Sequence, residues 1–366
     1  MAKSIQELLH YTSLTKSVLR TAEIPNPFPG AFSTNKEDVI GDSARYRLNF
    51  SQRKASRRAA YGSPAREFEL IDVGDATCKL VHTFESANLG GNQGPILWNQ
   101  LQAMDAYTQD TAREHLRHQL EQAGKRMGNH RIWALARQLR SGVQHYDANG
   151  NPLPSSSGAV TTVSNNVNAN NQNQLNGIIT ASWALNNTNI PLHILNLKKR
   201  TKRQSGLPID NALFGENLCS YLAVNTFVAE YLARSDQFRN TYINYAGGEL
   251  PANFLGIPKW TYVGDSFYTD DDGTNQDLWD GDAITFCPDP ETGGWHKLLE
   301  GQYWVPSSVD AYADGMSAMA SLKAVNGMGS FAQVIMNPPG AVHYQFDTFF
   351  HVFKTPDAIY QADVTP

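Results

Sequence analysis

A strongly basic stretch between segments with a strand-like pattern places the tightest constraint on the fold. Residues 45–66 contain seven basic side chains and no acidic one. Residues 44–50 (ARYRLNF) lead into this stretch, and residues 66–71 (REFELI) and 76–84 (ATCKLVHTF) follow it. All three segments alternate apolar and polar side chains, as half-buried strands do. The simplest interpretation is one long β-hairpin over residues 44–84, whose tip is basic and contains Gly and Ser.

The basic tip has two functional interpretations, and the sequence leaves both open. Arg and Lys are the usual contacts to a nucleic-acid backbone. They also dock on an acidic neighbour, where charge pairing sets register and choice of partner. A single aromatic residue among the charges gives little support to a platform that stacks bases. The residues that would make the contact are Arg53, Lys54, Arg57, Arg58, Tyr61 and Arg66.

An acidic stretch later in the chain offers a counter-surface for the basic tip. Residues 265–291 contain nine acidic side chains and no Lys or Arg. The net charge of −5 therefore conceals local fields of opposite sign. The candidate counter-surface consists of Asp270, Asp271, Asp272 and Asp277.

Composition excludes several classes of protein. The chain has 366 residues, of which 41% are apolar and 18% charged, so it is neither intrinsically disordered nor a coiled-coil rod. No run of 18 apolar residues occurs, which predicts no membrane span. The N-terminus lacks the apolar core of a secretion signal. Three widely spaced cysteines, Cys78, Cys219 and Cys287, indicate reduced packing residues rather than a disulfide framework.

Helical and strand-like patterns follow one another without regular alternation, which predicts an α+β fold rather than a doubly wound parallel sheet. An extended arm over residues 1–43 opens with a short helical pattern and is interrupted by PNPFPG. Apolar residues at three- and four-residue spacing predict the main helix within 95–141, with a kink at Gly124, Gly128 and Asn129. Further helices are expected within 194–208 and 215–240, hairpins at 142–154 and 253–279, strands at 281–288, 342–354 and 355–364, a polar Asn-rich loop at 163–176 and an irregular segment at 305–340.

No motif for catalysis, metal binding or a cofactor survives inspection. The Gly-rich segment at 90–94 lacks the Lys and Ser or Thr of a phosphate-binding loop. An EF-hand loop built on the acidic turn at 269–273 would begin at Tyr268 and end at Trp279, where carboxylates are required. His115 and His118 lie three residues apart among arginines and do not form HExxH. We therefore expect no catalytic residue, no metal and no cofactor.

The segment KKRTKR at 198–203 is a second basic feature, and three interpretations stay open for it. Cations are favourable at the C-terminal end of a helix because of the helix dipole, so a solvated helix end is one interpretation. A contact with nucleic acid or with a protein is the alternative.

The order of these parts resembles the major capsid proteins of tailed phages that have the Hong Kong 97 capsid fold, and most closely their lambda-like branch. RRAAYGSPAREFEL (57–70) resembles the extended loop of that family, and IWALARQLRSGVQHYDANGNP (132–152) resembles the end of its spine helix. Three further stretches resemble the central-domain entry helix, the hairpin after it and the closing strands: 207–232, 255–288 and 352–364. The likeness covers most of the chain from about residue 40.

The resemblance implies a domain plan. It divides the chain into an N-terminal arm (1–43), strands with the extended hairpin loop (44–84), a peripheral domain with the spine helix at about 100–141 (85–200, joined by 341–366) and an axial or central domain (201–340).

The resemblance also implies a structural function without catalysis. The chain would assemble with itself, through hexamers and pentamers, into an icosahedral shell around phage double-stranded DNA, which it contacts non-specifically. Its implied partners are a separate scaffolding protein, a portal and a decoration protein, and its location is the virion after assembly in the host cytoplasm. An encapsulin-type shell around protein cargo is the alternative within the fold, and a nucleic-acid-binding enzyme is the alternative outside it.

Overall fold

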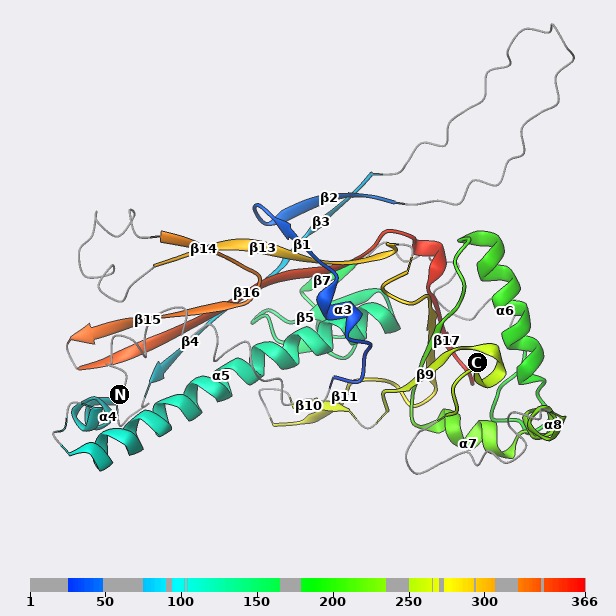
Figure 1. Ribbon diagram of the computed structural model, residues 1–366, viewed down its shortest axis with the longest axis horizontal. Coiled ribbons are helices and arrows are strands. Elements are labelled where there is room, and N and C mark those ends of the chain that lie inside the picture. The colour runs from blue at the N-terminus through cyan, green and yellow to red at the C-terminus, as the bar shows by residue number, and fades with distance from the viewer. Residues whose placement is uncertain are drawn as a thin grey trace, which may run out of the picture.

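The computed structural model describes an elongated α+β molecule, which confirms the predicted fold class (Figure 1). The predictions for the helical pattern near the N-terminus, for the basic tip and for most of the Asn-rich segment lie outside the described residues. The structure describes residues 26–48, 75–89, 94–101, 103, 105–164, 179–234, 250–264, 266–269, 273–292, 294–306, 322–336 and 339–365.

A six-stranded sheet forms the long axis of the molecule, and we call it the long sheet. The strand order is β1-β13-β16-β15, with β14 paired to β13 and β4 paired to β16. All pairs are antiparallel except the parallel pair β1–β13. The bounds are β1 Lys36–Val39, β4 Val81–Leu89, β13 His296–Pro306, β14 Leu322–Asn326, β15 Gly329–Met336 and β16 Pro339–Phe353.

The central strand β16 changes partners along its 15 residues. Its first half lies between β15 and β4, with Phe346 opposite Gly329 on one side and Phe84 on the other. Its last five residues pair with β13, where Phe353 lies opposite His296. The predicted strand at 342–354 is confirmed, and it joins segments from both ends of the chain.

The helix α5 (Ala106–Arg140) runs alongside the long sheet for 35 residues. Asp105 caps its N-terminus, because one carboxylate oxygen accepts a hydrogen bond from the Thr108 amide at 3.0 Å. The helix agrees with the predicted spine helix, but the expected kink is wrong: α5 continues through Gly124, Gly128 and Asn129. Gly124 is buried, so the missing side chain permits close packing there.

The segment before β1 packs on the long sheet of its own chain. Phe28 is 4% exposed and Phe32, in helix α3 (Ala31–Thr34), is fully buried. The Phe32 ring lies 4.8 Å from the ring of His296. The extended arm expected over residues 1–43 therefore packs on the body of its own chain over residues 26–39, where apolar side chains and strand pairing hold it.

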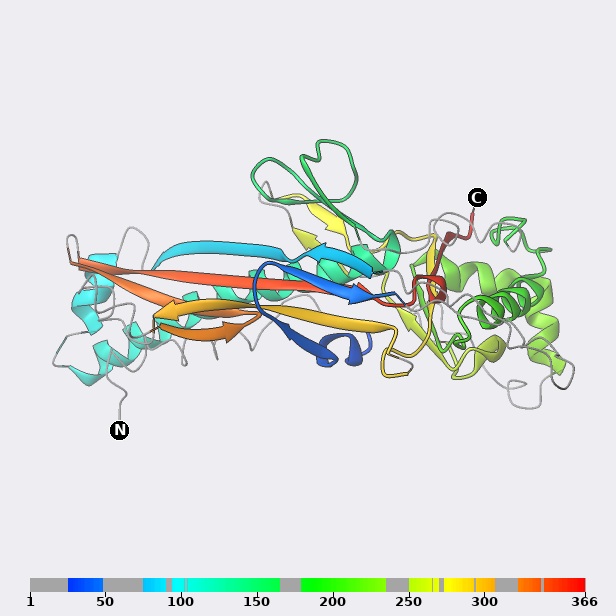
Figure 2. The ribbon, with the colours of Figure 1, turned by 90° about the horizontal axis from the view of Figure 1, so that it is seen from above.

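A second region lies beyond the end of the long sheet and forms a core of its own (Figure 2). Its four-stranded sheet has the order β17-β12-β8-β9 and is covered by three helices. Aromatic and aliphatic side chains such as Phe214, Phe254 and Ile284 fill this core without exposure. The bounds are α6 Ile190–Gln204, β8 Asn211–Phe214, α7 Asn217–Val224, α8 Thr226–Arg234, β9 Lys259–Tyr262, β12 Ala283–Cys287 and β17 Tyr360–Asp363.

The helix expected over residues 215–240 is broken into α7 and α8 at Asn225. The Asn225 side chain accepts a hydrogen bond from the Val228 amide at 3.0 Å and donates one to the Thr188 carbonyl at 2.8 Å. The first bond caps α8 and the second ties the break to the loop before α6.

Strand pairing divides the chain differently from the predicted domain boundaries. Strands β13, β14 and β15 belong to the long sheet, although residues 201–340 were expected to be axial. Helix α6 and strand β17 belong instead to the second region. The expected irregular segment at 305–340 is wrong for residues 322–336, which form β14 and β15.

Smaller hairpins lie beside the two larger sheets. The predicted hairpin at 142–154 is confirmed by β5 and β6, with Gly150 in the left-handed region at φ 85° in the turn. The hairpin within 253–279 is confirmed by the pairing of β10 with β11. The remaining bounds are β2 Ser43–Arg47, β3 Asp75–Lys79, α4 Gly94–Leu101, β5 Val143–Tyr146, β6 Pro152–Leu153, β7 Thr161–Ser164, η2 Phe254–Gly256, β10 Phe267–Thr269, β11 Asn275–Asp277 and η5 Pro356–Ala358.

Candidate functional site

Within the described ranges, no group of three or more His, Cys, Asp or Glu side chains is arranged to hold a metal ion. The cysteines are buried and unpaired. Burial raises the pKa of Cys78 and of Cys219 to about 11, so neither thiol is an activated nucleophile at neutral pH. His115 and His118 each contact a glutamine one turn further along α5, at 3.0 and 3.4 Å.

No helix in the described part of the chain combines the length and the apolar character that crossing a membrane requires.

The strands that carry the predicted basic tip are present as a paired ribbon, β2 and β3. Their antiparallel register places Arg45 opposite Thr77 and Ser43 opposite Lys79. Arg45, Arg47 and Lys79 are exposed on this ribbon. The predicted pairing of the two hairpin strands is therefore confirmed at its base. The predicted contact residues Arg53, Lys54, Arg57, Arg58, Tyr61 and Arg66 lie outside the described residues.

Part of the predicted acidic surface is described, and Asp277 is its described member. Asp277 ends β11 with its side chain exposed, while its backbone carbonyl accepts a hydrogen bond from the Arg137 guanidinium at 3.1 Å. That bond anchors the β10–β11 hairpin to α5. Asp270, Asp271 and Asp272 lie outside the described residues.

Other carboxylates of the acidic stretch stabilise the fold. Asp280 pairs with Arg140 at 2.9 Å, at the C-terminal end of α5. Asp282 accepts hydrogen bonds from Asn217 and Tyr221 at 2.9 and 2.8 Å. Burial acts to raise the pKa of Asp282, but these bonds outweigh it and lower the pKa below its usual value. Some carboxylates of the acidic stretch are therefore already paired or hydrogen-bonded within the chain.

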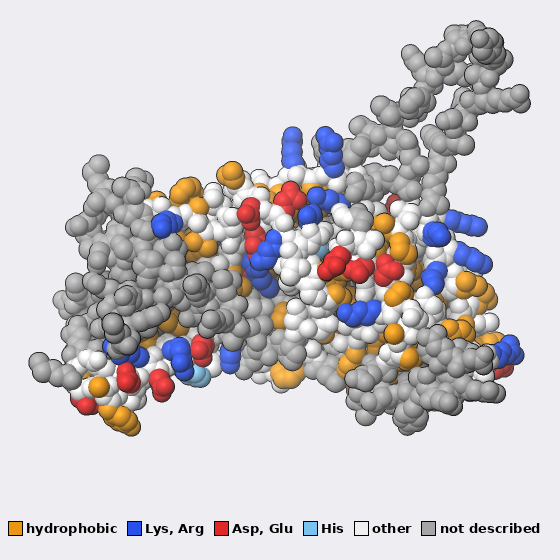
Figure 3. Space-filling model, in the orientation of Figure 1, with side chains coloured by type: hydrophobic (Ala, Val, Ile, Leu, Met, Phe, Trp, Pro, Cys, Tyr) orange, Lys and Arg blue, Asp and Glu red, His pale blue; other side chains and the backbone are white. Residues whose placement is uncertain are grey.

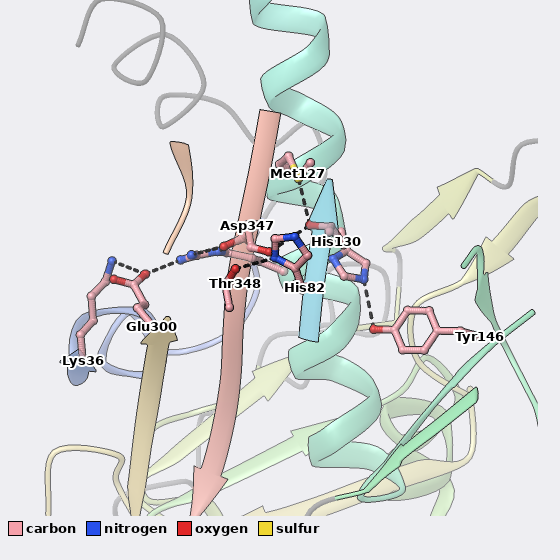
Figure 4. Close-up of polar contacts among 10 residues, drawn as sticks. Lys36, His82, Met127, His130, Tyr146, Glu300, Asp347 and Thr348 are labelled. Atoms are coloured by element: carbon pink, nitrogen blue, oxygen red, sulfur yellow. Dashed lines mark hydrogen bonds and ion pairs between the residues drawn. The ribbon is translucent and has the colours of Figure 1, made fainter. Parts of the chain in front are cut away.

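A buried network of charges joins α5 to the long sheet, and sequence reasoning did not find it (Figure 4). Arg131 of α5 makes two parallel hydrogen bonds to Asp347 of β16, each 2.6 Å long. The same guanidinium donates to Glu300 of β13 at 2.8 Å. Lys36 of β1 also donates to Glu300, at 2.9 Å. Four elements from distant parts of the sequence thus share one set of charge-assisted bonds.

Burial and charge pairing oppose each other in this network, and charge pairing prevails. The Asp347 side chain is fully buried, and that of Glu300 is 8% exposed. Burial alone would lower the pKa of Arg131, but the charges of Asp347 and Glu300 and the hydrogen bonds to them hold it above its usual value. Burial likewise would raise the pKa of Glu300, and Arg131 and Lys36 lower it instead. Arg131 and Glu300 therefore stay charged at neutral pH.

The turn between β14 and β15 closes over the network with no room for a side chain. Gly327 has φ 69°, and a Cβ added there would lie 2.7 Å from the Glu300 carboxyl carbon. The same Cβ would lie 2.9 Å from the Arg131 guanidinium. Glycine is required here both by the backbone angle and by the close approach.

Further polar groups lie beside the network at the interface of α5 and the long sheet. His82 of β4 contacts the Thr348 hydroxyl at 2.8 Å, and Thr83 donates to the sulfur of Met127 at 3.4 Å. His130 of α5 contacts the Tyr146 hydroxyl of β5 at 3.1 Å. These contacts fix the rotation of α5 against β4, β16 and β5.

Solved structures of other proteins resemble this chain over most of its length. No family model and no curated protein matches it. The chain is similar to the crystal structure of a phage-related protein from Bordetella bronchiseptica RB50, with 8% identity over 100% of this chain and 98% of that chain, at a TM-score of 0.51. It is also similar to the mature capsid of bacteriophage PhiM1, with 9% identity over 94% and 88% of the two chains and a TM-score of 0.46. A virus-like particle from Pyrococcus furiosus gives 10% identity over 96% and 97% and a TM-score of 0.40.

The likeness to the phage-related protein shows that the two chains share a fold. The other two structures superpose less well. At this identity the likeness shows a shared fold and transfers no activity. The chain has that fold over its whole length: a mixed α+β subunit in which one long helix spans a long sheet.

Proposed function

We propose that this chain is the major capsid protein of a tailed phage, with the Hong Kong 97 type of capsid fold and of the lambda-like branch. It assembles through hexamers and pentamers into an icosahedral shell that encloses double-stranded DNA. The single observation that carries the proposal is the long helix locked along a long sheet in a fold shared end to end with a phage-related protein. No catalytic role is proposed.

The proposed domains follow the packing. The long sheet with α5 is the peripheral domain, and the second region with α6, α7 and α8 is the axial domain. The β2–β3 ribbon carries the extended loop toward a neighbouring subunit. In the shell, many modest contacts of this kind act together through multivalency.

The proposed contact pairs the basic tip with an acidic surface of the next subunit. The exposed carboxylate of Asp277 supports this assignment, together with the exposed cations at the base of the tip. Scaffolding, portal and decoration proteins are the further partners that we propose for assembly.

Sedimentation and negative-stain imaging of the purified chain, with and without a co-expressed phage scaffolding protein, test the proposal. We expect shells, tubes or discrete hexamers and pentamers. Reversing two charges of the tip, Arg57→Glu with Arg58→Glu, is expected to block assembly while leaving the circular dichroism spectrum unchanged. The matched control reverses two exposed cations elsewhere, Arg117→Glu on α5 with Arg234→Glu on α8, and is expected to assemble.

A monomer that persists at high concentration even with scaffold would refute the proposal. Normal shells from the tip variant would refute the assigned contact. Shells that copurify with one defined enzyme would favour the encapsulin alternative instead.

A further inference from the structure

The second basic segment of the chain forms a compact charged surface on α6. Residues 148–209 contain no Asp or Glu, and their five Lys or Arg residues all lie between Lys198 and Arg203. In the structure this run occupies the last two turns of α6. Figure 3 shows blue side chains gathered over that end of the helix.

Two of the five cations, Lys198 and Arg200, are half-buried. The Lys198 ammonium donates a hydrogen bond to the carbonyl of Gly256. The elements that pack against α6 therefore cover these two side chains in part.

Lys199, Lys202 and Arg203 are exposed. An α-helix rises about 1.5 Å per residue, so Lys199 and Arg203 are separated by about 6 Å along the axis. The negative end of the helix dipole, about half a unit charge, favours cations in the last turn. The helix dipole favours a cation at Lys202 and at Arg203, which lie in the last turn. It has less effect at Lys199, which lies before that turn.

We propose that Lys199, Lys202 and Arg203 on α6 bind the phosphate backbone of double-stranded DNA, without sequence specificity. This inference rests on the proposed function and adds which surface of the subunit meets the packaged DNA. DNA carries one negative charge per about 1.7 Å of its axis, so three cations over about 6 Å can each meet a phosphate. Repetition of this weak contact over many subunits makes it effective.

The test compares two charge-neutralised variants of the full chain. The first carries Lys199→Gln, Lys202→Gln and Arg203→Gln, and leaves Lys198 and Arg200 in place. The matched control removes three exposed cations elsewhere, through Arg117→Gln, Arg234→Gln and Lys259→Gln. The readout is the affinity for a duplex of random sequence as a function of salt. Each phosphate contact contributes about 0.9 to the slope of log affinity against log salt.

We expect the slope of the α6 variant to fall by about 2.7 and that of the control variant to stay near the wild-type value. Between about 50 and about 200 mM salt, the wild-type affinity would then drop about 40-fold more than that of the α6 variant. If the triple variant fails to fold, the double variant Lys199→Gln with Arg203→Gln is expected to reduce the slope by about 1.8.

An unchanged slope in a folded α6 variant would overturn the inference, and so would a loss confined to the control variant. Weaker retention on polyglutamate with an unchanged DNA slope would also overturn it, since the surface would then fit an acidic protein. Failure of the wild-type chain to form shells refutes the proposed function separately, because sedimentation measures it without DNA.

Discussion

The two regions of the molecule are held together by different kinds of interaction. The interface of α5 with the long sheet contains buried charges, with Arg131, Asp347 and Glu300 at its centre. The core of the second region is apolar, and buried polar groups there such as Thr201 and Asn225 are uncharged and bonded to backbone carbonyls. A long helix lying along a long sheet can slide or roll without losing much apolar contact. The directional hydrogen bonds of Arg131 prevent α5 from sliding or rolling. In the second region, burial of apolar side chains is sufficient to hold the three helices in place.

The largest effect is expected from breaking the charge network. Arg131→Met keeps the apolar stem but leaves the carboxylates of Asp347 and Glu300 buried without their main partner. We expect the free energy of unfolding to fall by about 3 to 5 kcal/mol, measured by urea denaturation of the unassembled subunit. Arg117→Met is the control on the same helix, since its 3.6 Å pair with Glu121 is solvent-exposed and is worth about 0.5 kcal/mol or less. Equal losses in the two variants would contradict the assigned role of the network.

A smaller effect, and one that depends on pH, is expected from the buried histidine of the long sheet. His343 is fully buried, neither ring nitrogen has a hydrogen-bond partner among the described residues, and burial lowers its pKa to about 4. In the unfolded chain the pKa is about 6.5, so the unfolded state binds the extra proton between these two values. Proton uptake by the unfolded state therefore costs no stability above pH 6.5, and the molecule loses stability as the pH falls toward 4.

His343→Leu removes that dependence. We expect its stability relative to wild type to increase by about 2 kcal/mol between pH 6.5 and pH 5, from about 1.4 kcal/mol per pH unit. The exposed His115→Gln on α5 serves as the control and should follow the wild-type curve. Parallel curves for His343→Leu and wild type, followed by thermal or urea denaturation, would show that this side chain is not buried in its neutral form.

The smallest effect is expected from trimming the second region. Ile194 of α6 is 1% exposed, so Ile194→Val removes one buried methylene group and should cost about 1 kcal/mol. Its neighbour Leu195 is 47% exposed, and Leu195→Val should change stability by less than about 0.5 kcal/mol. Urea denaturation of both variants checks the difference. A loss of several kcal/mol for Ile194→Val would contradict the view that Ile194 contributes only the burial of its side chain.

Local patterns predicted the elements that local sequence controls. The long helix follows from apolar spacing over many turns, and the structure places it at Ala106–Arg140 within the expected range. The turn at Asn149–Gly150 follows from the backbone preference of glycine. The expected kink failed because Gly124 is buried against the body of the protein, and tertiary packing outweighs its low helix propensity.

Long-range pairing explains what the sequence did not reveal. Strands β14 and β15 lie in a segment rich in Gly, Ala and Met, and they are strands because β13 and β16 pair with them. Arg131 is one of several arginines in α5, and its partners are 169 and 216 residues away. No spacing rule connects such positions. The candidate contacts at Arg57 and Arg58 rest on charge alone and stay predictions.

The matched lengths of α5 and β16 have a mechanical consequence. A 35-residue helix is about 52 Å long, and a 15-residue strand is about 50 Å long. The two run side by side and are joined by the bonds between Arg131 and Asp347. Two long elements that are joined in this way resist bending far better than either element alone. In the proposed shell, curvature and internal pressure are therefore accommodated at the contacts between subunits and not within each subunit.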